Sequence, residues 1–325
     1  MRPREVRYGR VAMSASLTLP APIRVLARSA DGAQLVAVHE TAFTHVDVAS
    51  LAATGSGPVS GVVYACGVTP DGASVLLGAR SPCLVDLASG KVAGAAFKGP
   101  TSAANALAFS ADGTTVYLAH GSFAAPADCF IYAFDLGSRA LRWRAAATPG
   151  DGATDVVCVG DRVVVFGEQG VVALLEPARG ASAGRVQLVA PAPYGGALVL
   201  GAALDATSVV AATLDEGEPL VARVTLGEGK LPVAWRSTLA LDEADPDEAV
   251  VMGRPFVTGA SVHVPVRWSD GEAAHLTLVT LDADTGAVRG ERELDGCHDH
   301  RGVIALPGDR VAWAAGATLR VESLV

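Results

Sequence analysis

The sequence predicts an all-β protein built from many short strands. Its 325 residues include 36 glycines and 18 prolines, a density of chain breakers that is hard to reconcile with long helices. Half of the residues are hydrophobic and 18% are charged, which allows a large core and argues against global disorder. At about 150 residues per domain the length suggests two domains, but single all-β domains often run longer.

A repeat with a period of about 40 residues decides between these alternatives. Its clearest copies are residues 27–38 (ARSADGAQLVAV), 66–77 (CGVTPDGASVLL) and 107–118 (LAFSADGTTVYL). Their Asp-Gly pairs begin at Asp31, Asp71 and Asp112 and separate two apolar runs. Asp-Gly in this setting predicts a β-hairpin, because glycine adopts the positive φ that a tight turn needs.

Two further strands follow each hairpin, so the repeating unit has four strands, named a to d in chain order. Strand c ends in an acidic residue before a turn of small residues, as in CLVDLASGK at 83–91, and strand d is exemplified by ALRWRAAA at 140–147. The pattern decays toward the C-terminus but still predicts seven units. They cover about 23–57, 62–99, 104–147, 154–189, 197–241, 250–294 and 302–325.

The last unit has residues for three strands only, at 303–306, 310–315 and 318–323. A strand-like stretch at 11–19 precedes the first unit and can supply the missing strand, which closes the ring and covers an exposed edge. Seven units of about 46 residues are close to the length of four-stranded propeller blades. We therefore predict one domain over residues 1–325, a seven-bladed β-propeller of antiparallel blades, in which residues 1–12 are an extension if Met13 is the start.

The first three units resemble the WD40-like and YVTN-type bacterial propellers through SADG, TPDG and SADG followed by VDV, VDL and FDL. The segment YAFDLGSRALRWRA at 132–145 is similar to the tryptophan-docking motif of quinoprotein-like propellers, and LDADTGAVRGERE at 281–293 has the same form without its tryptophan. The Trp-Asp and Gly-His signatures of true WD40 repeats are absent. Such propellers serve as enzymes, receptors and scaffolds, so the resemblance implies a fold more than a function.

Net charge, cysteine content and the N-terminal residues restrict the classes of partner and the cellular compartment that we expect. The net charge of −9 argues against nucleic-acid and anionic-membrane partners. The five cysteines are odd in number and form no CxxC pair, which favours core thiols in a reducing compartment. The charged N-terminus lacks the apolar stretch of a signal peptide. We expect a cytoplasmic protein.

The face that carries the d–a and b–c loops, here the upper face, is the expected functional face, since its loops are longer and more variable than the a–b turns. Acids gather in its loops, with DEADPDE at 242–248 as the densest run. An acidic face suits a cation or a basic protein segment, whereas single acidic loops can simply keep the surface solvated. The candidate partner-binding residues are His39, Glu40, His120, Phe123, Asp215, Glu216, Asp245, Asp247, Trp268, Asp270 and Asp299.

Catalytic and metal motifs are weak. The loop Cys297-His298-Asp299-His300 contains Zn²⁺ ligand types, and His298 and His300 are the weak metal candidates, but no second pair lies near them in sequence. A buried cysteine in a polar loop explains the run as well. Residues 180–184 (GASAG) match a nucleophile pattern that requires a strand before it and a helix after it, whereas here it lies in a turn between strands. We assign no catalytic residue and no cofactor.

Two function classes remain. The first is a non-enzymatic interaction or scaffold module that presents acidic loops to a protein or peptide partner, within a larger assembly or alone. The alternative is a propeller enzyme, a metal-dependent lactonase or hydrolase with its site at the mouth of the central channel. Asn105 is the only asparagine, so the asparagine-containing calcium sites of gluconolactonase-like propellers cannot be assembled in full. The first class is favoured.

Overall fold

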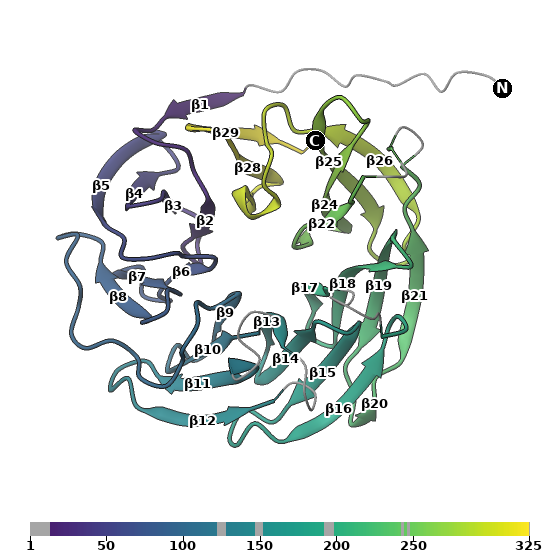
Figure 1. The fold of residues 1–325 in the computed structure, drawn as a ribbon, viewed down its shortest axis with the longest axis horizontal. Coiled ribbons are helices and arrows are strands. Elements are labelled where there is room, and N and C mark those ends of the chain that lie inside the picture. The colour runs from purple at the N-terminus through teal and green to yellow at the C-terminus, as the bar shows by residue number, and fades with distance from the viewer. Residues whose placement is uncertain are drawn as a thin grey trace.

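Seven small antiparallel sheets form a ring around a central axis (Figure 1). The computed structural model describes residues 14–121, 128–146, 152–191, 198–241, 244–245 and 248–324. Each sheet runs outward from strand a near the axis to its last strand at the outer edge of the ring. The predicted seven-bladed β-propeller is confirmed. In the described part of the chain, no helix has the length and apolar character needed to cross a bilayer.

The blades follow one another along the chain. Blade one holds β2 (Val25–Arg28), β3 (Gln34–Val38), β4 (Ala42–Asp47) and β5 (Ala52–Pro58). Blade two holds β6 (Cys66–Val68), β7 (Ser74–Leu77) and β8 (Cys83–Asp86). Blade three holds β9 (Ala106–Phe109), β10 (Thr115–Ala119), β11 (Ile131–Asp135) and β12 (Leu141–Ala145). Blade four holds β13 (Ala153–Val159), β14 (Arg162–Gly167), β15 (Val171–Leu175) and β16 (Ser182–Gln187).

The later blades have longer inner hairpins. Blade five holds β17 (Leu200–Asp205), β18 (Ser208–Asp215), β19 (Glu218–Thr225) and β21 (Val233–Thr238). Blade six holds β22 (Val251–Met252), β23 (Phe256–Thr258), β24 (Ser261–Ser269), β25 (Ala274–Asp282) and β26 (Val288–Glu293). Blade seven holds β27 (Val303–Leu306), β28 (Arg310–Ala315) and β29 (Thr318–Ser323), preceded by the short 3-10 helix η2 (His300–Gly302).

The N-terminal strand closes the ring, as predicted. β1 (Ala15–Thr18) pairs antiparallel with β29, with Ala15 opposite Val321 and Thr18 opposite Thr318. This strand is the outer strand of blade seven, so the two ends of the described chain are joined in one sheet. β1 therefore covers the edge of β29 that a three-stranded last blade would leave open.

Blade two departs from the four-strand pattern. After β8 the chain makes a single bridge, between Val85 and Val92, in place of a fourth strand. Two backbone hydrogen bonds hold it there, from Asp86 N to Lys91 O (2.9 Å) and from Ala93 N to Leu84 O (2.8 Å). Glycines at 90, 94 and 99, all with positive φ, prevent the segment from continuing as a strand.

The Asp-Gly turns on the lower face share one geometry. In blade two, Thr69 Oγ1 donates to Asp71 Oδ1 (2.6 Å), and the same oxygen accepts from Ala73 N (3.0 Å). Ser29 with Asp31 and Ser110 with Asp112 repeat this arrangement in blades one and three. The glycines that follow have φ between +66° and +72°. The repeated Ser/Thr-x-Asp-Gly therefore serves the turn itself.

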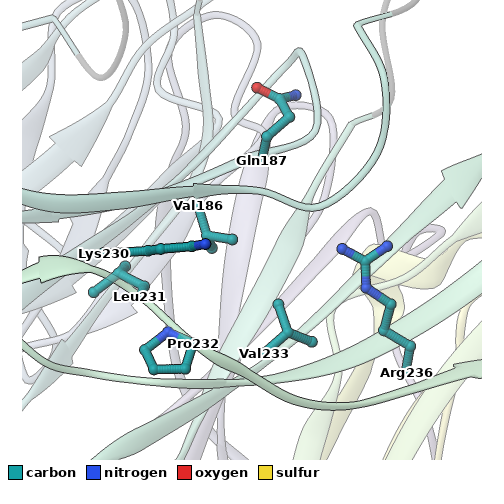
Figure 2. Close-up of a pocket in the computed structure, with 7 residues that line it drawn as sticks. All are labelled: Val186, Gln187, Lys230, Leu231, Pro232, Val233 and Arg236. Carbon is teal, nitrogen blue, oxygen red and sulfur yellow. The ribbon is translucent and has the colours of Figure 1, made fainter.

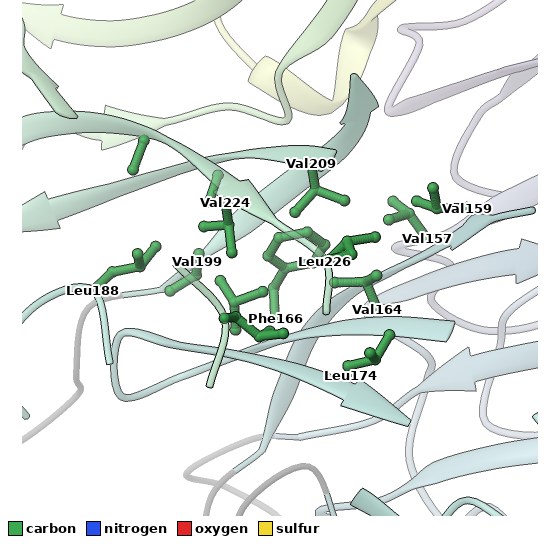
Figure 3. Close-up of a cluster of buried hydrophobic side chains, with 14 of the residues drawn as sticks. Val157, Val159, Val164, Phe166, Leu174, Leu188, Val199, Val209, Val224 and Leu226 are labelled. Carbon is green, nitrogen blue, oxygen red and sulfur yellow. The ribbon is translucent and has the colours of Figure 1, made fainter. Parts of the chain in front are cut away.

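The hydrophobic core lies between blades. Seven clusters of buried side chains each join two neighbouring blades, and Figure 3 shows the cluster between blades four and five. Its centre is Phe166 of β14, which packs on the backbone of Gly201 in β17 so closely that a Cβ at 201 would lie 1.9 Å from the ring. The sheets are thin, and face-to-face packing around the ring supplies the burial.

Two of the four tryptophans, Trp143 and Trp235, link neighbouring blades through their outer strands. Trp143 Nε1 donates to Pro177 O of blade four (2.7 Å), and Trp235 Nε1 donates to Ala283 O of blade six (3.1 Å). The ring of Trp143 packs on Gly180. The 180–184 motif therefore gives room to a tryptophan and continues into the strand β16, without the helix that a nucleophile turn requires.

Candidate partner-binding face

The top of blade six brings together the most chemically distinct group on the upper face. Trp268, at the end of β24, stacks on His275, at the start of β25, with ring centroids 4.6 Å apart and an angle of 22° between the planes. His275 Nε2 lies 3.1 Å from Asp270 Oδ2, in the turn between the two strands. Trp268 Nε1 donates to Thr277 Oγ1 (2.9 Å), which fixes the indole.

A second carboxylate approaches the same imidazole from the outer strand of blade six. Glu293, at the end of β26, places Oε1 2.9 Å from His275 Nδ1. Its hydrogen bond raises the pKa of His275 against the opposing effect of burial, and Asp270 raises it further. Backbone hydrogen bonds from Ala273 and Glu272, with that of His275, lower the pKa of Asp270 to about 2. The site therefore places two carboxyl groups around one titratable histidine.

Asp245 approaches from the d–a loop. Its backbone N–H donates to Ser269 O (2.7 Å), and its carboxylate lies beside Gly271, where a Cβ would come within 2.7 Å of Oδ2. We call Asp245, Trp268, Asp270, His275 and Glu293 the blade-six rim. The side chains of Asp270 and Glu293 are 39% and 55% exposed, so the carboxylates face solvent beside the aromatic pair.

Three other predicted residues lie on the upper face of other blades. Glu40 is exposed and pairs with Arg24 at 3.8 Å. Asp215 and Glu216 lie at the tight turn between β18 and β19, where Glu216 adopts φ +51°. Phe123 and Asp247 lie outside the described residues. Whether any of these contacts a partner stays a prediction.

His39 and His120 are inside the protein. The ring of His39 is 4% exposed, with Nδ1 3.1 Å from Pro22 O and Nε2 3.0 Å from Thr44 Oγ1. It ties the d–a loop to strand c within blade one. We therefore leave both histidines out of the surface proposed below.

His120 belongs to a buried network in blade three, which ties its d–a loop to its b–c loop. Ser102 Oγ donates to Asp128 Oδ2 (2.8 Å) and lies 3.2 Å from His120 Nδ1, while Tyr132 donates to Asp128 Oδ1 (2.5 Å). Burial lowers the pKa of His120 to about 4. Burial would raise the pKa of Asp128, but the hydrogen bonds from Tyr132, Thr101 and Ser102 lower it overall.

The side chains of the 297–300 loop make contacts with other groups of the protein. Asp299 accepts from Arg301 Nε (3.0 Å) and Nη2 (2.7 Å), and it caps η2 through Arg301 N. Cys297 is buried, and burial raises the pKa of its thiol to about 11. His300 packs beside Gly253 of blade six. Among the described residues, no three His, Cys, Asp or Glu side chains are grouped so that they could hold a metal ion, His298 and His300 included.

The inner strands carry an ion pair that the sequence did not reveal. Asp155 of β13 is 1% exposed, and its Oδ1 lies 2.8 Å from Arg254 Nη2 of blade six. Gly201 N donates to the other oxygen (3.0 Å), and Arg254 also donates to Val156 O (3.0 Å) and Gly201 O (3.2 Å). Arg254 thus bridges blade six to blades four and five.

Sequence reasoning found Trp268, Asp270 and Asp245 but missed His275 and Glu293. A usable signal was present for His275: a hairpin centred on the 270–273 turn pairs Ser269 with Ala274 and Trp268 with His275. Glu293 required the register of β25 and β26, in which it lies opposite Thr277. That register depends on a bulge between Thr280 and Leu281, which the residue pattern does not announce.

Comparison with known proteins supports the fold. No protein-family model and no curated protein matches the chain. Among solved structures 1177 chains match, so the fold is widely shared. One is the structure of U3-55K, which is 12% identical, with a TM-score of 0.69 over 95% of this chain and 98% of that chain. At this identity the likeness concerns the seven-bladed propeller alone.

Proposed function

We propose that this protein is a non-enzymatic interaction module whose blade-six rim binds a basic segment of a protein or peptide partner. The observation that carries the proposal is the Trp268–His275 stack held between the carboxylates of Asp270 and Glu293. A lysine or arginine side chain can lie on the indole face and pair with these acids. A propeller commonly serves as a rigid scaffold for such contacts.

The finer assignments belong to the same proposal. The likeness to WD40-like, YVTN-type or quinoprotein-like propellers of bacteria rests on the Asp-Gly turns and the c-strand acids. A cytoplasmic location is supported by five cysteines that form no disulfide. The hydrolase alternative requires acids free to bind a metal at the axis, whereas Asp155, on an inner strand, already accepts from Arg254 and two backbone N–H groups.

A labelled peptide of alternating lysine and glycine tests the rim by fluorescence anisotropy. Trp268→Ala and the pair Asp270→Asn/Glu293→Gln should each weaken binding roughly tenfold, because they remove the aromatic face or the two acids. Asp161→Asn removes an exposed acid from the a–b turn of blade four on the opposite face. It should change affinity less than twofold. Equal losses in the rim and control variants would mean non-specific attraction to an acidic protein and would refute the proposal.

The pH dependence of this binding has a defined sign. A protonated His275 neutralises part of the charge of Asp270 and Glu293, so the rim becomes more negative as pH rises through the raised pKa of the imidazole. Affinity for the basic peptide should therefore increase over that interval in the wild type. His275→Gln should bind with nearly constant affinity from pH 6 to 8, measured in the same titration.

A further inference from the structure

A groove lies on the outer edge of the ring, between the outer strands of blades four and five (Figure 2). Its volume is about 600 Å³. Its lining residues are Val186, Gln187, Lys230, Leu231, Pro232, Val233 and Arg236. Val186 and Val233 come from the facing strands β16 and β21 and pack against the inter-blade core, so they form an apolar floor. The groove is formed by blades four and five and shares no residue with the blade-six rim.

The protein itself adds a strand to one end of this edge. β20 (Gly229–Lys230) leaves the c–d connection of blade five and pairs parallel with β16, with Gly229 opposite Gly184 and Lys230 opposite Arg185. The chain then turns away through Pro232 into β21. β20 is the only strand paired with this edge in the described residues, so β16 continues past it at Val186 and Gln187.

The register of β16 directs backbone N–H and C=O groups that do not bond to β15 toward the groove. Leu188 N donates to Gly170 O (2.7 Å), so the residues of β16 in step with Leu188 bond inward to β15. Gln187 is out of step, and its N–H and C=O point to the outer edge. An edge with open backbone groups beside apolar side chains is where an extended peptide adds as a strand.

Unpaired cations surround the groove. Lys230 and Arg236 line it, and Arg185 lies beside β20. None of the three has an ion-pair partner among the described residues, whereas the protein as a whole carries a net charge of −9. No acidic side chain is among the described residues that line the groove. This local reversal of charge favours an acidic occupant.

We propose that this groove binds an extended acidic segment of a partner protein, which adds as a strand to β16 beyond β20 and pairs with Lys230 and Arg236. Alternating side chains of the segment would enter the groove over Val186 and Val233. A protein segment is favoured over a nucleic acid because the described lining residues include no aromatic ring on which bases could stack.

The test uses a fluorescein-labelled octapeptide of alternating valine and glutamate, measured by anisotropy. Lys230→Glu/Arg236→Glu should weaken binding at least tenfold. The matched control is Lys91→Glu/Lys98→Glu, which changes the net charge equally at two exposed lysines of blade two. It should weaken binding less than twofold. Equal losses in the two double variants would overturn the proposal.

Strand addition is tested separately from charge. Two further peptides carry N-methyl groups on either the odd or the even amides, so that both keep every side chain. One should bind at least fivefold more weakly than the other, because one set of amides faces β16. Equal affinities for the two, or tighter competition by a single-stranded oligothymidylate, would overturn the proposal. The outcome is independent of the blade-six rim, which the lysine peptide probes.

Discussion

Blades three and six place the same three kinds of side chain at the same corner of the blade and use them in opposite ways. Blade three has His120, Asp128 and Tyr132 around its b–c loop, with the imidazole and phenol rings 5.2 Å apart at 81°. Blade six has Trp268, Asp270 and His275 around its b–c turn. The first set is buried, whereas the second is at the surface.

Burial decides the chemistry of each set. Inside blade three, desolvation keeps His120 neutral, and Asp128 is satisfied by donors from the d–a loop and strand c. At the blade-six rim, the imidazole lies between two carboxylates and gains a proton more readily. A histidine, an acid and an aromatic ring therefore form a buried link between loops in blade three and a solvent-exposed group in blade six.

Removing a carboxylate should produce the largest difference in stability between blade three and blade six. Asp128→Ala leaves the N–H groups of Thr101 and Ser102 and the Tyr132 hydroxyl without their acceptor in a buried site. We expect the free energy of unfolding to fall by about 3 to 5 kcal/mol. The matched rim variant Glu293→Gln should cost less than about 0.5 kcal/mol, since exposed ion pairs contribute little. Urea denaturation of both variants measures the difference, and similar costs would remove the contrast.

A smaller change tests one bond of the buried network. Tyr132→Phe removes the donor to Asp128 Oδ1 but keeps the ring, and we expect a loss of about 1 to 2 kcal/mol. Tyr64→Phe is the matched control. Its ring is 43% exposed and lies under the Arg301 guanidinium, so loss of its hydroxyl should leave stability nearly unchanged. If the two variants lose the same stability, the Tyr132 bond is not what holds the loop.

The repeated features of the fold were predictable from the sequence, and the non-repeated ones were not. The Asp-Gly pairs and the three-strand last unit gave the blade number and the N-terminal closing strand, because local turn chemistry and strand counting determine both. The missing fourth strand of blade two and the added strand β20 depend on glycine placement and on a neighbouring blade. His39 and Glu40 are adjacent in sequence, yet one is buried and the other exposed. Only the packing of the d–a loop distinguishes them.

The smallest expected effect is the difference in pKa between His120 of blade three and His275 of blade six. His120 has its pKa lowered to about 4 by burial, so its neutral form stabilises the fold above the ordinary histidine pKa. That contribution is lost as pH falls below the ordinary value toward 4, since the unfolded chain takes up the proton first. For His275 the sign is reversed: its raised pKa gives a stabilisation that is complete below the ordinary value and lost as pH rises through the folded pKa.

Proton–carbon NMR of the imidazole Cε1 groups resolves this contrast without unfolding the protein. The His275 signal should titrate above the ordinary histidine pKa, and Glu293→Gln should move its midpoint down, because Glu293 contributes the largest upward shift. The His120 signal should not move between pH 5.5 and 8 in either protein. His263, whose pKa burial also lowers to about 4, is an internal control for a buried imidazole whose two nitrogens lie within hydrogen-bond distance of threonine hydroxyls. A His275 midpoint at or below the ordinary value would show that the two rim carboxylates do not hold the imidazole, and the rim would then lose its pH-dependent charge.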